Sequence, residues 1–284
     1  MNVLVLGASG MLGNAVFRYF SGDADYRTYG TVRQHAALRH FEPRLHRHLL
    51  CGVDVLNPDW LARAFESAKP DVVVNCVGLI KQLETANDPL EALPINALLP
   101  HRVARMASLV GARMIHVSTD CVFSGRQGNY LESDLPDATD LYGRSKLLGE
   151  VDYPHAITLR TSIIGHEFGR TTALVDWFLS QTQSVKGFRK AVFSGVPTVE
   201  LARVMKDFVL PHPELRGLYH VAAKPIAKFD LLTLVAREYG KTIEIVADDA
   251  LAIDRSLNAT RFHEATGYSA PEWHALIDTM HQFK

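Results

Sequence analysis

A glycine-rich turn lies almost at the start of this chain, and it restricts the fold more than any other feature of the sequence. Residues 7–13 read Gly-Ala-Ser-Gly-Met-Leu-Gly, between an apolar run at 3–6 and a segment at 14–20 that favours a helix. A strand whose two faces are both covered by helices is expected to be apolar throughout. The order of strand, glycine turn and helix therefore predicts the first unit of a parallel α/β sheet.

The same turn predicts a ligand. Glycines let the backbone approach a pyrophosphate closely, and the N-terminus of the following helix offers unpaired N–H groups and the positive end of its dipole. The spacing is GxxGxxG and differs from the GxGxxG of common dehydrogenases. A tight strand–helix junction without a ligand is the alternative interpretation. The predicted dinucleotide-binding residues of the turn are Gly7, Ser9, Gly10, Met11, Leu12 and Gly13.

Strands and helices alternate over about the first 160 residues, which predicts a Rossmann-type doubly wound parallel sheet. Further strands are expected at 27–32, 49–53, 71–77, 113–117 and 156–160, and helices at 58–67, 98–110 and 141–151. After residue 165 the regularity weakens. We therefore expect a dinucleotide-binding domain of residues 1–165 plus strands near 190–222. Residues 166–189 and 223–284 are expected to form a smaller C-terminal α/β substrate lobe.

Arg33 follows the second predicted strand, where dehydrogenases that prefer NAD tend to carry an acidic residue. An arginine suits a 2′-phosphate because of its charge and planar donor fork. The sequence thus favours NADP(H), with NAD(H) as the alternative. A surface arginine is a competing interpretation, since Arg39 and Arg44 are nearby. Asp54 and Val55 follow the third strand and are candidate adenine contacts, although Asp54 could equally cap a helix.

Tyr142 and Lys146 are four residues apart near a predicted helix start, so they share one helical face. A tyrosine hydroxyl normally keeps its proton until about pH 10, and a nearby ammonium is expected to lower that pKa. The pair could then exchange a proton with a carbonyl or carbinol oxygen, while the lysine holds ribose hydroxyls. Ser118 and Thr119 end another predicted strand, where a hydroxyl can stabilise charge developing on a substrate oxygen. The alternatives are an ordinary exposed helix and a strand-end turn.

The bulk composition excludes several classes of function. The formal net charge is −1, so a general role in binding nucleic acid or an anionic membrane has no support. No apolar run approaches the ~18 residues that span a bilayer, and no signal peptide is recognisable, so we expect a cytoplasmic protein. The three cysteines form no CxxC pair and are expected to be reduced. The histidines at 40, 46 and 48 lack acidic partners at ligand spacing, so no metal site is predicted.

Several motifs together resemble those of the extended short-chain dehydrogenase/reductase superfamily, and within it the dTDP-4-dehydrorhamnose reductase group. These are GASGMLG at 7–13, VSTDCVFSG at 117–125, YGRSK at 142–146 and RTSIIG at 160–165. The resemblance covers most of the chain and weakens after residue 165. It implies a Rossmann domain followed by a small substrate domain.

The resemblance also implies roles for individual residues. Thr119, Tyr142 and Lys146 would be the catalytic triad, with Ser118 beside the cofactor. Cys76, Val77 and Gly78 would pass beside the nicotinamide or its ribose. Asn96 matches a family asparagine, and the segment 160–162 would lie near the sugar nucleotide. The implied substrate contacts are Lys81, Thr119, Asp120, Cys121, Tyr142, Thr161 and Arg255.

The chain departs from these reductases at two places that should face the sugar. Cys121 stands where they usually have tyrosine, and residues 77–82 replace a stretch that is alanine-rich in many of them. Lys81, within that segment, could contact an acidic substituent or a phosphate, or remain solvated. The related dehydratases place a glutamate directly after the aspartate that corresponds to Asp120. Its absence here argues against a dehydratase.

The function predicted from the sequence is NADPH-dependent reduction of a keto group on a nucleotide-activated 6-deoxysugar. One alternative is a sugar-nucleotide epimerase that retains NAD. Another is a non-catalytic regulatory protein that binds a dinucleotide on the same fold, since fold alone does not establish function. Many relatives pair through helices flanking the active site, so a homodimer is expected.

Overall fold

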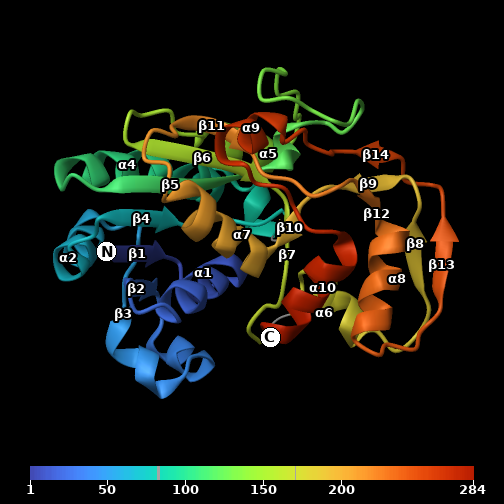
Figure 1. Ribbon diagram of the computed structural model, residues 1–284, viewed down its shortest axis with the longest axis horizontal. Coiled ribbons are helices and arrows are strands. Elements are labelled where there is room, and N and C mark those ends of the chain that lie inside the picture. The colour runs from blue at the N-terminus through green and yellow to red at the C-terminus, as the bar shows by residue number, and fades with distance from the viewer. Residues whose placement is uncertain (82–83, 170) are drawn as a thin grey trace.

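A seven-stranded parallel sheet forms the centre of the computed structural model, which describes residues 1–81, 84–169 and 171–284 (Figure 1). The strand order is β11-β6-β5-β4-β1-β2-β3. The strands are β1 (Asn2–Leu6), β2 (Arg27–Val32), β3 (Leu49–Cys51), β4 (Val72–Asn75), β5 (Arg113–Thr119), β6 (Ala156–Thr161) and β11 (Gly217–His220). The chain builds outward from β1 to β3 and then returns to β4 on the other side of β1. The predicted Rossmann-type doubly wound sheet is therefore confirmed, with its topological switch point between β1 and β4.

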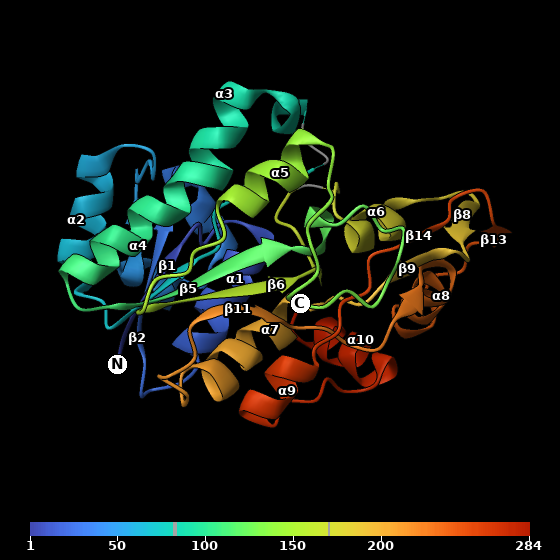
Figure 2. The ribbon, with the colours of Figure 1, turned by 90° about the horizontal axis from the view of Figure 1, so that it is seen from above.

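Helices cover both faces of this sheet (Figure 2). One face carries α2 (Pro58–Ala68), α4 (Leu99–Leu109) and α5 (Leu141–Leu148), and the other carries α1 (Met11–Ser21) and α7 (Thr198–Val204). Successive residues of a strand point to opposite faces. Val73 of β4 accordingly belongs to the buried cluster under α2 and α4, and Val74 to the cluster under α1 and α7. This explains why β1 and β4 are apolar over most of their length.

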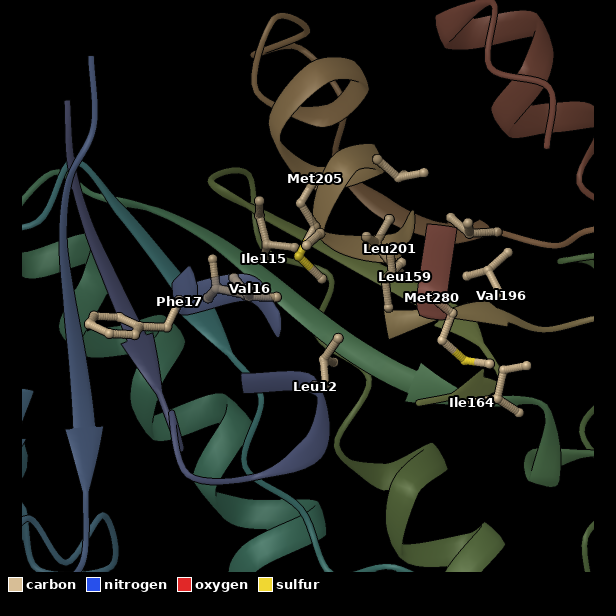
Figure 3. Close-up of a cluster of buried hydrophobic side chains, with 14 of the residues drawn as sticks. Leu12, Val16, Phe17, Ile115, Leu159, Ile164, Val196, Leu201, Met205 and Met280 are labelled. Atoms are coloured by element: carbon tan, nitrogen blue, oxygen red, sulfur yellow. The ribbon is translucent and has the colours of Figure 1, made fainter. Parts of the chain in front are cut away.

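The core under α1 and α7 joins the two halves of the chain. Figure 3 shows Leu12, Val16 and Phe17 of α1 in the same cluster as Leu201 of α7 and Ile115 of β5. All five side chains are at most 6% exposed. Burying one large apolar side chain contributes roughly 1.5–3 kcal/mol to stability. The helix that follows the glycine turn is therefore fixed in place by tertiary packing.

Smaller sheets and the remaining helices make up the rest of the molecule, mostly beyond the carboxyl ends of the large sheet (Figure 1). The smaller sheets are β7 (Ile163–Ile164) with β10 (Val196–Pro197), β8 (Val185–Phe188) with β13 (Ile245–Asp248), and β9 (Ala191–Phe193) between β12 (Ile226–Ala227) and β14 (Ile253–Asp254). The other α-helices are α3 (Pro89–Ala92), α6 (Leu174–Ser180), α8 (Lys228–Glu238), α9 (Thr260–Thr266) and α10 (Trp273–Gln282). Short 3-10 helices occupy His35–His40, Pro43–His48, Glu84–Asn87 and Asp120–Val122, and π-helical turns occupy Leu93–Leu98 and Met205–Val209.

None of the helices in the described ranges is both long enough and apolar enough to cross a lipid bilayer.

Candidate active site

The glycine turn at residues 7–13 has the backbone geometry of an anion cradle. Gly7 adopts a φ of +81°, which is the left-handed region that favours glycine. A Cβ on Gly13 would collide with the Gly7 carbonyl oxygen, so helix α1 passes directly over the turn. No side chain caps α1 at Gly10, which leaves the first N–H groups of the helix for a ligand. Leu12 is 6% exposed and points into the core, so it can offer only its backbone.

Cys76, Val77 and Gly78 connect the turn to the catalytic helix. The Val77 side chain lies against Gly7, where a Cβ would stand 2.9 Å from Val77 Cγ2. At the other end of this segment, a Cβ on Gly78 would lie 3.8 Å from Lys146 Nζ. Three residues after β4 therefore cover the whole distance from the glycine turn to the lysine.

Arg33 and Asp54 lie together at the carboxyl edge of the sheet, because Val53 N donates to Val32 O across a distance of 3.2 Å. Both side chains are exposed, whereas Val55 is half-buried and packs on the core under α2. Asp54 Oδ1 accepts a hydrogen bond of 3.0 Å from Leu56 N. Asp54 is thus a turn-capping residue that still lies next to Arg33.

Helix α5 presents the two central residues of the site. Asp140 is its N-cap and accepts a hydrogen bond of 2.9 Å from Gly143 N. A Cβ on Gly143 would collide with the carbonyl oxygen of Cys121, so the start of α5 packs directly on the turn that follows β5. Tyr142 consequently lies at the end of β5, where the Thr119 side chain is close enough to act on the pKa of its hydroxyl.

Burial is the main cause of the pKa shifts of Tyr142 and Lys146. Burial raises the pKa of Tyr142 well above its ordinary range, and the neighbouring Cys121 thiol adds to this effect. Burial lowers the pKa of Lys146 to about 8. Lys146 Nζ donates to Val117 O at 2.8 Å. The expectation that Lys146 lowers the pKa of Tyr142 is therefore wrong for this structure, because desolvation dominates and the ammonium is engaged elsewhere.

Asn96 ties the site together from a π-helical turn before α4. Its Oδ1 accepts from Leu79 N at 2.9 Å, and its Nδ2 donates to Ser145 Oγ at 3.2 Å. The side chain is 1% exposed. Asn96 therefore fixes the segment beside Lys146 to the helix that carries Lys146, which gives a physical basis for the position that the sequence resemblance singled out.

Asp120 and Cys121 lie beside Thr119 at the end of β5. Thr119 Oγ1 donates to Asp120 Oδ1 at 3.2 Å and accepts from Cys121 N at 3.1 Å. Burial raises the pKa of Asp120, and the charge of Arg255 opposes this rise. Burial also raises the pKa of the Cys121 thiol to about 12. Arg255 Nε donates to Phe123 O at 2.8 Å, so Arg255 belongs to the same group of residues.

Four predicted site residues have their side chains engaged within the protein. Lys81 pairs with Asp140 at 3.0 Å, at the start of α5. Thr161 is 1% exposed and donates to Ser162 O at 3.1 Å. Ser118 Oγ donates to Glu150 at 2.7 Å. Arg160, expected near the sugar nucleotide, is 1% exposed, and its guanidinium pairs with Glu150.

Gln82 belongs to the segment predicted to face the sugar, but it lies outside the described residues. The three clustered histidines take separate structural roles. His40 stacks on Phe168, His46 hydrogen-bonds to Phe41 O, and His48 packs edge-on against Tyr29.

Sequence reasoning missed Lys228, the first residue of α8. Lys228 is half-buried, and burial together with the charge of Arg255 lowers its pKa, while the Cys121 thiol opposes that change. Ala227 and Asp254 both pair with Val192, on either side of β9, so Lys228 and Arg255 follow two positions that flank the same residue of the central strand. Nothing local in the sequence signals this proximity, because it depends on two strands that are 27 positions apart in the chain.

The chain was compared with known protein families and structures. The sequence profile described as "RmlD substrate binding domain" matches residues 1–281. The chain belongs to this family. The match confirms the resemblance predicted from the motifs. Since it covers almost every residue, both the large sheet and the smaller part belong to the family's common architecture.

Two curated relatives of this RmlD-family chain carry different names. One is "dTDP-4-dehydrorhamnose reductase" of Escherichia coli, 27% identical over an alignment of 308 positions; the alignment covers 99% of this chain and 97% of the relative. The other is "Methionine adenosyltransferase 2 subunit beta" of zebrafish, Danio rerio. It is 29% identical over an alignment of 248 positions, which covers 82% of this chain and 72% of the relative.

Among solved structures, a dTDP-4-dehydrorhamnose reductase from Bacillus anthracis in complex with NADP has a TM-score of 0.80. It is 20% identical, and the superposition covers 99% of this chain and 98% of that one. At this identity the likeness establishes the fold.

Proposed function

We propose that this RmlD-family chain is an enzyme that reduces a keto group on a nucleotide-activated 6-deoxysugar at the expense of NADPH. The observation that carries the proposal is the protonated Tyr142 hydroxyl, held beside Thr119 at the end of β5 and one helical turn before Lys146. The name of the E. coli relative supports the class of substrate, a keto sugar linked to a nucleotide.

The residues around the glycine turn fit a dinucleotide. The turn has no room for a Cβ at Gly13, and the uncapped start of α1 can bind a pyrophosphate. The proposed cofactor contacts are those predicted from the sequence, with Ser118 reaching the site through its backbone because its hydroxyl is held by Glu150. When bound there, NADPH supplies the hydride.

The chain's own residues would manage the proton and the developing charge. As the carbonyl oxygen gains negative charge, the Thr119 hydroxyl would stabilise it with a hydrogen bond. Tyr142 would donate the phenolic proton to that oxygen. A raised pKa does not prevent this step, because an alkoxide is a stronger base than a phenolate. The ammonium of Lys146 would compensate the negative charge left on Tyr142.

Five side chains are proposed to surround the sugar nucleotide: Thr119, Asp120, Cys121, Tyr142 and Arg255. The proximity of Lys228 to Arg255 and Cys121 adds a second cation at this position. A diphosphate linkage carries two negative charges, which two cations would match. Lys81 is proposed to leave Asp140 and to contact the substrate instead, since the ion pair between Lys81 and Asp140 is partly exposed.

The predicted division of the chain and its assembly also remain proposals. The presence of β11 in the large sheet supports a domain of residues 1–165 plus strands near 190–222, although β9 pairs with β12 and β14 and is better assigned to the smaller lobe. A homodimer through the helices beside the active site is supported by the exposed Leu98 and Leu148. The three free cysteines are compatible with the reducing cytoplasm.

The test of the proposed function is oxidation of NADPH in the presence of nucleotide-linked 4-keto-6-deoxysugars. We expect Tyr142→Phe to bind NADPH with unchanged affinity and to lose at least about 100-fold in turnover, which is the usual contribution of a positioned acid. Fluorescence titration measures the binding, and absorbance at the nicotinamide band measures the turnover. Wild-type turnover in the variant would contradict the role of Tyr142.

A second candidate function is that of a dinucleotide-binding subunit without its own turnover. It is favoured by the zebrafish relative, whose name describes a subunit of a different enzyme. Tight binding of NADPH together with no oxidation by any sugar of the panel would support it. Release of bound NAD from the purified protein would instead favour a sugar-nucleotide epimerase.

Cofactor choice gives an independent prediction. We expect Arg33→Ser to weaken NADPH binding by about 10-fold or more, because a charged hydrogen bond to the 2′-phosphate contributes roughly 1.5–3 kcal/mol. NADH binding should not change. Arg39→Ser, in the 3-10 helix His35–His40 that follows Arg33, is the control. Equal losses for NADPH and NADH would mean that Arg33 acts through folding.

A further inference from the structure

Glu150 is a largely buried acid behind the catalytic helix, and the mechanism above gives it no role. It lies two residues beyond the end of α5. Its carboxylate accepts hydrogen bonds from Arg160 Nε at 2.9 Å and Arg160 Nη2 at 2.6 Å, and from Ser118 Oγ at 2.7 Å. The side chains of Glu150 and Arg160 are 12% and 2% exposed. Three charge-assisted hydrogen bonds thus fix one carboxylate.

The residues that Glu150 and Lys146 hold are neighbours on β5. Lys146 Nζ donates to the carbonyl of Val117, and Glu150 accepts from the hydroxyl of Ser118. The next residue along the strand is Thr119. The two charged side chains therefore bracket the end of β5 from the same helix terminus, and Glu150 is four residues after Lys146.

Arg160 also contacts the segment that follows β5. Its guanidinium lies 5.0 Å above the Phe123 ring, and its Nη1 is 3.0 Å from His220 Nε2. Burial lowers the pKa of His220 to about 3, so this imidazole stays neutral. Arg160 is therefore the cation that balances Glu150, and neither charge is neutralised by His220.

Several titratable groups lie near Lys146, and most of them carry no charge. Burial raises the pKa of the Cys76 thiol, after β4, to about 12, so this thiol is neutral at physiological pH. Burial lowers the pKa of His116, on β5, well below its usual value, so it is neutral as well. Tyr142 keeps its proton. Among the described residues, Glu150 is then the ionised acid whose field supports the Lys146 ammonium.

We propose that Glu150 is a positioning residue for the reduction, holding Lys146 as an ammonium against Val117 while it fixes Ser118 beside the catalytic threonine. This inference rests on the proposed function for its effect on turnover. Its effect on Lys146 does not depend on any substrate.

The sign of the effect follows from electrostatics. Removing the negative charge of Glu150 destabilises the ammonium and lowers the pKa of Lys146. In the variant, Lys146 would therefore lose its proton at a lower pH, and the alkaline limb of the turnover profile would move to lower pH by the same amount.

The test uses Glu150→Gln and the double variant Glu150→Gln/Arg160→Gln. The double variant leaves no unpaired charge buried, which protects folding. The matched control is Glu200→Gln. Glu200 is 4% exposed and likewise accepts from an arginine, Arg203, at 2.9 and 2.7 Å and from the Tyr268 hydroxyl at 2.9 Å. It lies on α7, on the opposite face of the sheet.

The measurement is the titration of Lys146 in protein labelled with ¹³Cε-lysine, with the resonance assigned by Lys146→Arg. We expect the midpoint to fall in Glu150→Gln, to fall less in the double variant because the opposing field of the Arg160 cation is lost as well, and to stay unchanged in Glu200→Gln. An unchanged midpoint in Glu150→Gln, or an equal fall in the control, would overturn the proposal. Since the titration needs no substrate, it decides the role of Glu150 even if no sugar is reduced.

Discussion

Tyr142 and Lys146 lie one helical turn apart, yet burial acts on their protons in opposite directions. Desolvation favours the neutral form of each group, so it raises the pKa of the phenol and lowers that of the ammonium to about 8. Near neutral pH the phenol holds its proton and the lysine is still largely charged. This is the starting state for donating a proton to a carbonyl oxygen, and it suits reduction better than oxidation.

The glycine turn gives a prediction at the level of a single atom. In Gly13→Ala, the added Cβ would meet the Gly7 carbonyl, and backbone cannot yield as a flexible side chain can. We expect the turn to open and NADPH affinity to fall by at least about 10-fold, as measured by fluorescence titration. Gly22→Ala, at the other end of α1, is the control because its Cβ would make ordinary contacts of 3.5 Å or longer. Normal binding by Gly13→Ala would exclude the cradle.

Single residues also mark where sequence reasoning was limited. The positions of Thr119, Tyr142 and Lys146 follow from motifs, because strand ends and helix faces are local properties. The ion pair between Arg160 and Glu150 could not be predicted, because nothing in the sequence marks Glu150 as buried. An arginine at a strand end is equally compatible with a ligand or an internal ion pair, and only the packing distinguishes them.

At the scale of elements, the start of helix α5 depends on its N-cap residue, Asp140. Asp140 caps the helix and also pairs with Lys81, so one carboxylate orients the turn that carries Tyr142. We expect Asp140→Ala to lower the free energy of unfolding by about 1 kcal/mol, as for other lost N-caps. We also expect a fall in kcat of about 10-fold, since a displaced acid is a poor catalyst.

The control for this prediction is Asn57→Ala. Asn57 caps α2 by accepting from Asp59 N at 2.9 Å, and α2 carries none of the candidate site residues. Urea unfolding should report a similar loss of stability for both variants, while only Asp140→Ala should lose turnover. A fall in kcat for both variants would attribute the effect to general destabilisation.

Most of the large elements could be predicted from sequence, and several of the small ones could not. The strand at 27–32 was predicted with its observed bounds, since β-branched and aromatic residues between turn signals form a local pattern. Strand β5 extends to Thr119, beyond its expected end, because Ser118 and Thr119 pair with β6. Strands β8 and β13 were not predicted, because each is four residues long and pairs with a segment about 60 residues away.

At the scale of the whole molecule, the large sheet and the C-terminal residues meet at the segment that follows β5. Asp254 N donates to Gly125 O at 2.8 Å, and Arg255 Nε donates to Phe123 O at 2.8 Å. Tyr130 N donates to Ser256 O at 2.9 Å. Residues proposed to bind the sugar nucleotide are therefore held against the catalytic strand by backbone contacts, so their spacing depends on how closely the two segments approach.

Gly125 controls that approach. A Cβ at this position would collide with Ile253 and lie 3.0 Å from Arg255 Cγ. In Gly125→Ala we therefore expect Arg255 to move away from Asp120, which would raise KM for the sugar nucleotide by about 10-fold, equivalent to roughly 1.4 kcal/mol of binding. NADPH affinity should not change, because the glycine turn lies at a different part of the sheet edge.

The left-handed backbone at Gly125, with φ +85°, adds a strain that must be separated from the collision. Gly267→Ala provides this control, since Gly267 has φ +73° and no atom within 4 Å of its Cβ position. Both variants should lose comparable stability in urea, and steady-state kinetics should show a raised KM only for Gly125→Ala. If KM rises equally in both, the contact between the two segments does not set substrate affinity, and the placement of Arg255 in the substrate site loses its main support.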